Sequence, residues 1–288
     1  MWIMTAIEFY RLTEETLNNL AKAYDIEDLE KYYQLTDIES LKETRYNELD
    51  EIGQIFAQIA FHGQNAQRID KIVDFKNNFD FIDKVTENFN PKKFLDKYEN
   101  IENIENKQKA IVEELRKGLK WNSKNSNKRP DSFAKRFAGI LLCAAEYLKT
   151  FAAREDVVED LMKNYTNFTS LIDYFTDRMN IGFSVPLSCD FLKEFDDRFV
   201  LPKPDVHLKD TMAKYLKKRY KDTNKDNYQC IKDTIDVVNE INAELKKEGK
   251  QEMTVYQFDR MIYLVCSQNF FLDDKTKGIK KVFLDKIE

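Results

Sequence analysis

The sequence predicts an all-α protein, and three features support that fold class. Glycine and proline are scarce, at 7 and 5 of 288 residues, so few positions favour a helix end or a tight turn. Apolar side chains recur at helical spacing in most segments, and no segment has the alternating pattern of a convincing strand. This periodicity indicates about ten to twelve helices. The chain length suits one large domain or two smaller domains that share a cleft.

In the first half of the chain, helical patterns alternate with short polar breaks. Helices are expected at residues 5–22, 26–35 and around 52–59, from about residue 67, after the proline at 91, and at 104–119. In the third of these, Ile52, Ile55, Phe56 and Ile59 lie at i, i+3, i+4 and i+7, which is typical of a buried helix. The stretch FHGQNAQ, residues 61–67, is expected to break this helix and form a loop.

The second half begins with the clearest predicted loop, at residues 120–131, which is polar and carries four basic side chains. After it, residues 132–153 are apolar enough to form a central helix that is buried on most sides. Further helices are expected within 155–179, where there are one or two, and at 206–220, 228–249 and 255–270.

Composition narrows the functional class. The four cysteines lie far apart and form no CxxC pair, so no zinc site is indicated, and we expect no metal and no cofactor. The cysteines are expected to be free, and the sequence shows no pattern of a signal peptide. No apolar run approaches the roughly 20 residues of a membrane helix. These features favour a cytoplasmic protein without a membrane partner. The first 60 residues carry 13 acidic and 5 basic side chains, whereas the remainder is slightly basic, which is compatible with DNA binding.

The stretch FVLPKPDVHLKD, residues 199–210, interrupts the helical pattern. It places two of the five prolines and one of the two histidines around Asp205. Because Asp205 precedes an amphipathic helix, its carboxylate is expected to accept N–H groups of the first turn, a cap that contributes about 1 kcal/mol. A plain helix cap is one interpretation. The other is a carboxylate that the cap aims at a substrate.

The element LPKPDVHL resembles the catalytic segment of the helix-hairpin-helix family of DNA glycosylases, in which a proline-containing loop delivers an aspartate at the start of a helix. The family's hairpin lies upstream of that loop and corresponds here to IGFSVPLSCDFLKEF, residues 181–195. Residues 59–72 resemble the family's early helix–loop–helix, whose glutamine reaches the gap left by a flipped nucleotide. Residues 258–270 resemble the late helix beside the catalytic one.

Two departures refine what the resemblance implies. The hairpin reads GFS and not Gly-x-Gly, so it has one glycine fewer for a close approach to a DNA phosphate. Members that cut the DNA backbone carry a lysine in the hairpin's second helix, and the matching positions here are Pro186 and Leu187. The resemblance therefore implies a monofunctional enzyme, in which water and not an amine attacks the sugar, without an iron–sulfur cluster.

The resemblance also assigns roles to individual residues. Asp205 would be catalytic, because a carboxylate stabilises the oxocarbenium ion that forms as an N-glycosidic bond breaks. Phe61 and His62 would line the pocket of the flipped base. The residues assigned to DNA contact are Gln64, Asn65, Phe183, Ser184 and His207. Lys128 and Arg129 are added to them because they belong to the basic cluster of the predicted loop at 120–131. Structural alternatives are core packing for the phenylalanines, an ordinary turn for the glutamine–asparagine pair, a locally bonded imidazole for His207 and a solvated face for the basic residues.

The predicted architecture is two helical subdomains that flank a cleft, one at residues 50–185 and one formed by 1–49 and 186–288. The leading hypothesis is a glycosylase that flips out a modified base of double-stranded DNA, excises it and leaves an abasic site. A composition rich in Lys, Asn, Ile and Asp favours a microbial or phage setting. The resemblance implies a hypermodified phage pyrimidine as the base and antiphage defence as the role, because branches that resemble this fold act on heavily modified phage bases. Two alternatives stay open: the same fold in the biosynthesis of hypermodified bases, and a non-catalytic helical module that binds nucleic acid or protein.

Overall fold

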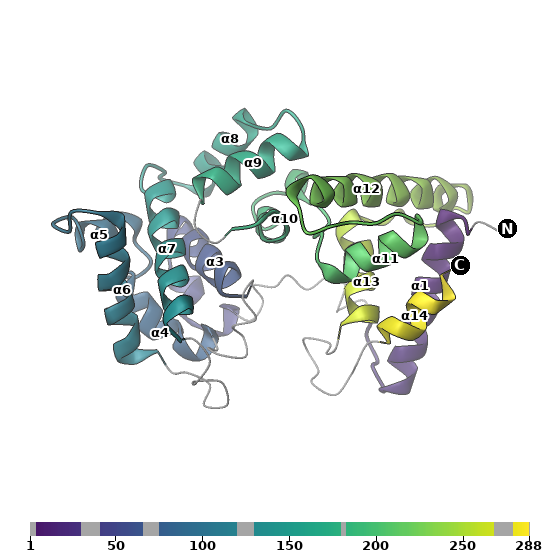
Figure 1. Cartoon of the computed structure of the whole chain (residues 1–288), viewed down its shortest axis with the longest axis horizontal. Helices are drawn as coiled ribbons and strands as arrows, with labels where there is room; N and C mark the ends of the chain where they lie inside the picture. The colour runs from purple at the N-terminus through teal and green to yellow at the C-terminus, as the bar shows by residue number, and fades with distance from the viewer. Residues whose placement is uncertain are drawn as a thin grey trace. The chain divides into compact units, whose positions relative to one another are not determined.

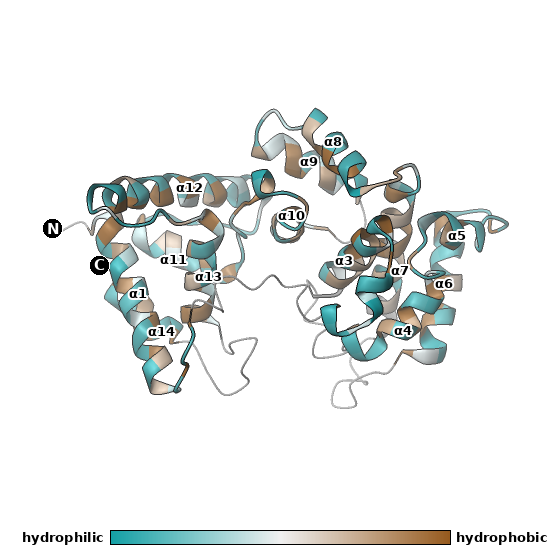
Figure 2. Cartoon of the chain, turned by 180° about the vertical axis from the view of Figure 1, so that it is seen from behind, coloured by the Kyte–Doolittle hydropathy of each residue, from teal (hydrophilic) through white to brown (hydrophobic). Residues whose placement is uncertain are grey.

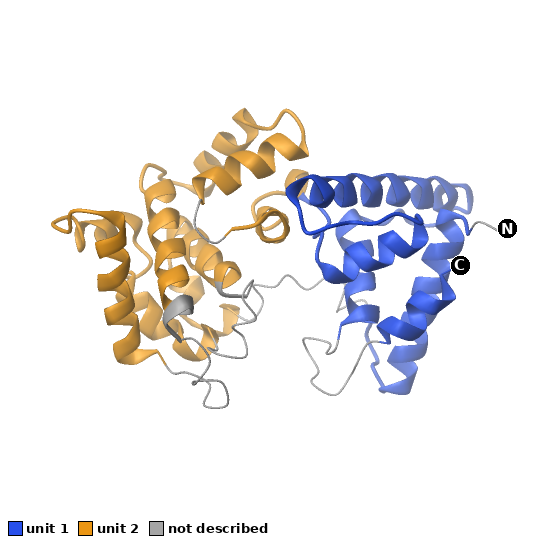
Figure 3. Ribbon diagram, in the orientation of Figure 1, with its two compact units in different colours: residues 1–35, 200–288 blue, residues 36–199 orange. Residues whose placement is uncertain are grey.

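The computed structural model describes residues 4–29, 41–65, 75–119, 130–179, 183–267 and 279–287, without the side chains of 64, 65 and 130–133. These residues form 13 α-helices and a few short 3₁₀ segments and contain no strand, which confirms the all-α class (Figure 1). The chain divides into two compact units (Figure 3): unit 1 comprises residues 1–35 and 200–288, and unit 2 comprises 36–199. Both predicted boundaries fall inside unit 2.

In each unit, every secondary-structure element among the described residues is a helix. Unit 1 contains α1 (Ala6–Ala23), α11 (Val206–Tyr215), α12 (Asn224–Lys247), α13 (Val255–Cys266) and α14 (Lys280–Lys286). Unit 2 contains η2 (Arg45–Glu48), α3 (Glu51–Asn65), α4 (Phe75–Val85), α5 (Pro91–Asp96), α6 (Ile104–Gly118), α7 (Pro130–Leu148), α8 (Arg154–Lys163), α9 (Phe168–Arg178), α10 (Val185–Leu192) and η4 (Asp197–Phe199). The predicted loop at 120–131 lies largely outside the described residues.

Helix α7 is the central helix of unit 2, as its apolar sequence predicts. It packs against α3, α5, α6 and α9, and Phe137, Leu141 and Leu148 on it are fully buried. Much of α7 is coloured as hydrophobic in Figure 2. A helix that is enclosed on several sides removes much apolar surface from water, at roughly 25 cal/mol per Å², so α7 organises the core of this unit.

Helix α3 corrects the break that the sequence predicted at residues 61–67. The helix continues through Asn65, so His62, Gly63 and Gln64 lie in a helix and not in a loop. The glycine serves close packing: a Cβ atom at position 63 would lie 2.8 Å from both Cδ1 and Cγ2 of Ile140 on α7. A glycine needed for the approach of two helices therefore resembled a turn residue in the sequence.

Gly63→Ala should lower the free energy of unfolding by about 1–3 kcal/mol, because the added methyl group overlaps Ile140. Combining it with Ile140→Ala should cost less than the sum of the two single changes, since the smaller residue makes room. Urea unfolding of the four proteins in this cycle measures the coupling. Additive costs would show that the α3–α7 contact does not depend on the glycine.

Helices α1, α11 and α12 each end with a residue in the left-handed conformation. Helix α1 stops at Ala23 because Asp25 takes a left-handed conformation, with φ of 55°, and the Ile26 amide donates to Ala21 O. Helix α11 stops at Tyr215, short of the predicted residue 220, through the same motif at Lys217, with φ of 52°. In both motifs a side chain occupies the position that glycine normally fills. Helix α12 ends the same way at Gly249, near the predicted residue 249.

Lys217→Gly should raise the stability of the protein by about 0.5–1 kcal/mol, because glycine adopts the left-handed conformation without a steric cost. Lys214→Gly is the matched control, since Lys214 is exposed inside α11 and glycine there should destabilise by about 1 kcal/mol. Thermal unfolding distinguishes the two signs. A loss of stability from Lys217→Gly would mean that the lysine side chain contributes more than its backbone conformation costs.

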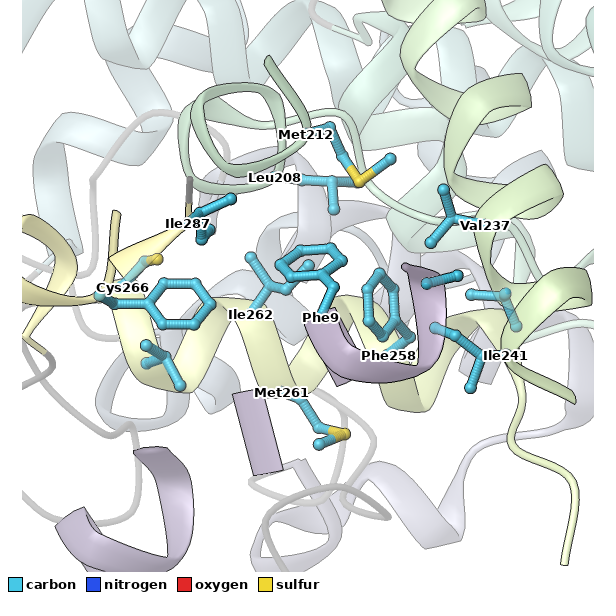
Figure 4. Close-up of a cluster of buried hydrophobic side chains, with 14 of the residues drawn as sticks. Phe9, Leu208, Met212, Val237, Ile241, Phe258, Met261, Ile262, Cys266 and Ile287 are labelled. Carbon is cyan, nitrogen blue, oxygen red and sulfur yellow. The ribbon is translucent and has the colours of Figure 1, made fainter. Parts of the chain in front are cut away.

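The core of unit 1 joins the two ends of the chain. Phe9 of α1 lies among residues of α11, α12, α13 and α14, including Leu208, Met212 and Phe258 (Figure 4). Its ring stacks on Tyr215 with the centroids 4.3 Å apart and meets Phe258 edge-on at 5.6 Å. The N-terminal helix therefore supports α11, which is the helix that Asp205 precedes.

Candidate functional site around Asp205

Asp205 is the N-cap of α11, as the sequence predicted. Its Oδ1 atom accepts the backbone N–H groups of His207 at 2.7 Å and Leu208 at 3.0 Å. The side chain is half-buried, and its Oδ2 atom accepts no hydrogen bond from the residues that the structure describes. One carboxylate oxygen is thus fixed at a helix N-terminus, where the dipole favours an anion, while the other keeps its acceptor capacity.

The proline loop before Asp205 is held by its surroundings. Pro202 and Pro204 are buried and restrict the backbone. The amide of Lys203, between them, donates to Asp259 Oδ2 on α13 at 2.9 Å. The Asp205 amide in turn donates to Lys203 O at 2.7 Å. The position of the Asp205 carboxylate is therefore set from α13 as well as from its own helix.

The face of α13 that lies beside this loop carries aromatic and charged side chains that sequence reasoning did not single out. The ring of His207 meets Tyr263 edge-on, with centroids 5.7 Å apart. The guanidinium of Arg260 lies 5.4 Å from the ring centroid of Tyr263 and 5.8 Å from that of Tyr256. The spacing of 256, 260 and 263 along the predicted helix was the signal available, because i, i+4 and i+7 share a helix face.

Two further groups border the start of α11. Lys280 Nζ, from α14, donates to Val206 O at 3.3 Å and to Asp210 Oδ2 at 2.6 Å. Burial raises the pKa of the Cys266 thiol to about 11, and the negative charge of Asp205 adds to that increase. Near neutral pH this cysteine is therefore a protonated thiol and not a thiolate nucleophile.

Phe61 and His62, the predicted base pocket, are buried in unit 2. His62 is 0 % exposed and Phe61 is 9 % exposed. Their rings lie 5.6 Å apart, and each also meets a core phenylalanine: Phe75 for the first and Phe191 for the second. The structure thus corrects this assignment, because continued helix in α3 turns both side chains into the core.

His62 lies between two buried carboxylates of the α10 region. Its Nδ1 atom is 3.6 Å from Asp190 Oδ2 and its Nε2 atom is 3.9 Å from Glu194 Oε1, distances that exceed a hydrogen bond. Lys193 Nζ pairs with Asp190 at 2.7 Å. We call His62, Asp190, Lys193 and Glu194 the α3–α10 polar cluster. Charges this deeply buried are stable only with partners, so the cluster fixes α10 against α3.

The segment predicted as a hairpin, residues 181–195, contains the whole of α10, which packs against α9. Residues 180–182, which precede it, lie outside the described part. Phe183 is 6 % exposed and meets the rings of Phe175 and Phe191, so it is a packed core ring and not a wedge between bases. Ser184 is exposed at the N-cap of α10, and its side chain forms no cap hydrogen bond.

Four of the residues assigned to DNA contact are not described by the structure at the level of side chains. Gln64 and Asn65 form the last residues of α3, but their side chains lie outside the described part. Lys128 and Arg129 lie in the undescribed segment 120–129. The structure therefore brings together Asp205 and His207 in unit 1, and Phe61, His62, Phe183 and Ser184 belong to unit 2.

No protein-family model matches the sequence, and no curated protein or solved structure matches it significantly. Within the described ranges, no helix combines the length and the apolar character that crossing a membrane requires. Nor do the described side chains include a group of three His, Cys, Asp or Glu residues placed to hold a metal ion. A function must therefore be inferred from the residues around Asp205.

His62→Ala should lower the free energy of unfolding by about 2–4 kcal/mol, because it leaves a cavity between two buried carboxylates. Its effect on any DNA reaction should follow the folded fraction, since the side chain is in the core. Lys135→Ala, at an exposed position on α7, is the control and should change stability by less than about 0.5 kcal/mol. A fully stable His62→Ala protein with a specific loss of activity would restore the base-pocket assignment.

Proposed function

We propose that this chain is a monofunctional DNA N-glycosylase that acts on a modified base in double-stranded DNA. The observation that carries the proposal is the geometry of Asp205: a half-buried carboxylate with Oδ1 held by two amides and Oδ2 not engaged by the described residues. Cleavage of an N-glycosidic bond needs such a group, because positive charge develops on the sugar as the base departs.

The proposed reaction is hydrolysis. The base leaves with the electron pair of the C1′–N bond, and the cationic sugar faces the Asp205 carboxylate. A water molecule then adds to C1′ and loses a proton, so the products are the free base and an abasic site. Asp205 would stabilise the cation and orient or deprotonate the water. The hairpin positions Pro186 and Leu187 hold no amine, so a Schiff base with the sugar is not expected there.

The proposed partner is a duplex from which the target base is flipped out. Exposed N–H groups at helix N-termini favour phosphate contacts, and Ser184 at the start of α10 offers an uncommitted hydroxyl for one. A hypermodified phage pyrimidine is the proposed base, with antiphage defence in the cytoplasm of a microbial cell as the proposed setting. This part of the proposal derives from the resemblance of LPKPDVHL and from the composition.

Asp205→Asn should reduce base release by about 100-fold or more, because the amide keeps the cap but loses the negative charge. DNA affinity should stay within a few-fold. The measurement is alkali-dependent cleavage of duplexes carrying uracil, oxidised, alkylated or glucosylated bases, with the free base identified by mass spectrometry. Strands should stay intact without alkali, and borohydride should trap no protein–DNA adduct.

Asp226→Asn is the matched control, because it makes the same change at another helix start, where Asp226 accepts the Lys221 amide. It should be as active as the parent protein. Equal activity of Asp205→Asn and the parent would falsify the catalytic assignment and favour a plain cap. Conversion of the base without its release would favour the alternative role in base biosynthesis, and DNA binding without turnover would favour a non-catalytic module.

A further inference from the structure

The proline loop, residues 202–204, has one backbone N–H group that can anchor it to the rest of the protein. Proline has no N–H group, so in the tripeptide Pro202–Lys203–Pro204 the amide of Lys203 is the single donor. That donor is used: it bonds to Asp259 Oδ2 at 2.9 Å. A bond to a carboxylate is stronger than one to a neutral acceptor, and its loss would leave a half-buried amide unpaired.

The bond connects directly to Asp205 through the backbone. Lys203 donates to Asp259 with its N–H and accepts the Asp205 N–H with its C=O, at 2.7 Å. Asp205 then accepts two amides of α11 with its carboxylate. The chain of contacts therefore runs from α13, through one peptide unit, to the group that we propose is catalytic.

Helix α13 is a rigid support for this contact. The residues on either side of Asp259 along the helix, Phe258 and Arg260, are 0 % and 8 % exposed, and Ile262 is fully buried. Helix α13 packs against α1, α11, α12 and α14. The Asp259 carboxylate also lies close enough to Cys230 of α12 to add to the increase in its thiol pKa, which burial raises to about 12. Asp259 itself is half-buried.

We infer that Asp259 is a positioning residue, which aims the Asp205 carboxylate by holding the Lys203 amide. The inference rests on the proposed function. Reaction rates are sensitive to such placement, because a shift of about 1 Å at a reacting group can cost on the order of 100-fold. Asp259 does not touch the substrate in this role, so it should affect the chemical step and not the affinity for DNA.

The test compares Asp259→Ala, which removes the acceptor, with Asp259→Asn, which keeps a carbonyl oxygen in the same place. In single-turnover assays on the duplex that the parent protein cleaves, Asp259→Ala should slow base release by about 10- to 100-fold. Asp259→Asn should restore the rate to within about threefold of the parent. DNA dissociation constants should agree within about twofold for all three proteins. Asp236→Ala, which removes an exposed carboxylate of α12, is the control and should have no effect.

Amide hydrogen exchange at Lys203 provides a second measurement that needs no substrate. The amide should be protected in the parent and in Asp259→Asn, and should exchange at least about tenfold faster in Asp259→Ala. If Asp259→Ala does not fold, Asp259→Ser replaces it, because its shorter side chain does not reach the Lys203 amide. The folded state of each variant is checked by circular dichroism and thermal unfolding.

The outcomes separate the inference from the proposed function. Base release by the parent together with full activity of Asp259→Ala would overturn the positioning role and leave the glycosylase assignment standing. Equal impairment of the Asn and Ala variants would also overturn it, because charge and not the hydrogen bond would then matter. A parent protein without base release on any duplex would overturn the proposed function and with it the catalytic meaning of Asp259. In that case faster hydrogen exchange of the Lys203 amide in Asp259→Ala would still establish that Asp259 holds this amide.

Discussion

The structure of unit 1 depends on the burial of one helix, α13, among α1, α11, α12 and α14. Its apolar side, with Phe258 and Ile262, meets Phe9 from the opposite end of the chain and Leu208 and Met212 from α11. That packing holds the start of α11 in place, and the same helix contributes Asp259 to the proline loop. A helix supported on several sides can position a carboxylate more accurately than a free loop can, which is what a reacting group needs.

The interior of unit 2 combines an apolar core with buried charged side chains. Its centre is the apolar helix α7, but unit 2 also contains the α3–α10 polar cluster, whose charged side chains have almost no exposure to water. Buried charges of this kind contribute little net stability, because desolvation offsets their attraction, yet removing one partner is expensive. Their effect here is to specify how α10 sits against α3. Helix α10, which lies within the segment that the resemblance identified with a hairpin, is therefore held in place by this cluster.

Sequence reasoning was accurate where local chemistry decides the outcome. Asp205 caps α11 as its position before the helix predicted, and helices start close to the predicted residues 5 and 255 and at Pro91. The end of α11 was less accurate, because the helix stops at Tyr215, where Lys217 takes a left-handed conformation without glycine, and not at the predicted residue 220. The end of α1 was predicted within one residue, although Asp25 also takes that conformation without glycine. What holds these residues there is the 6→1 hydrogen bond and the tertiary packing that follows it, and neither leaves a mark in the sequence.

The sequence by itself determined the all-α class, the apolar central helix and the cap at Asp205, because each follows from the spacing and chemistry of neighbouring residues. Only the tertiary structure decided that His62 is a core residue, since polarity and a nearby glycine at 63 indicated a loop that helix packing excludes. It likewise decided that Phe183, which the predicted hairpin left open, packs against Phe175 and Phe191. It also decided that Asp259, 54 positions beyond Asp205, meets the proline loop. Contacts between residues so far apart depend on how helices pack, and local patterns carry no information about them.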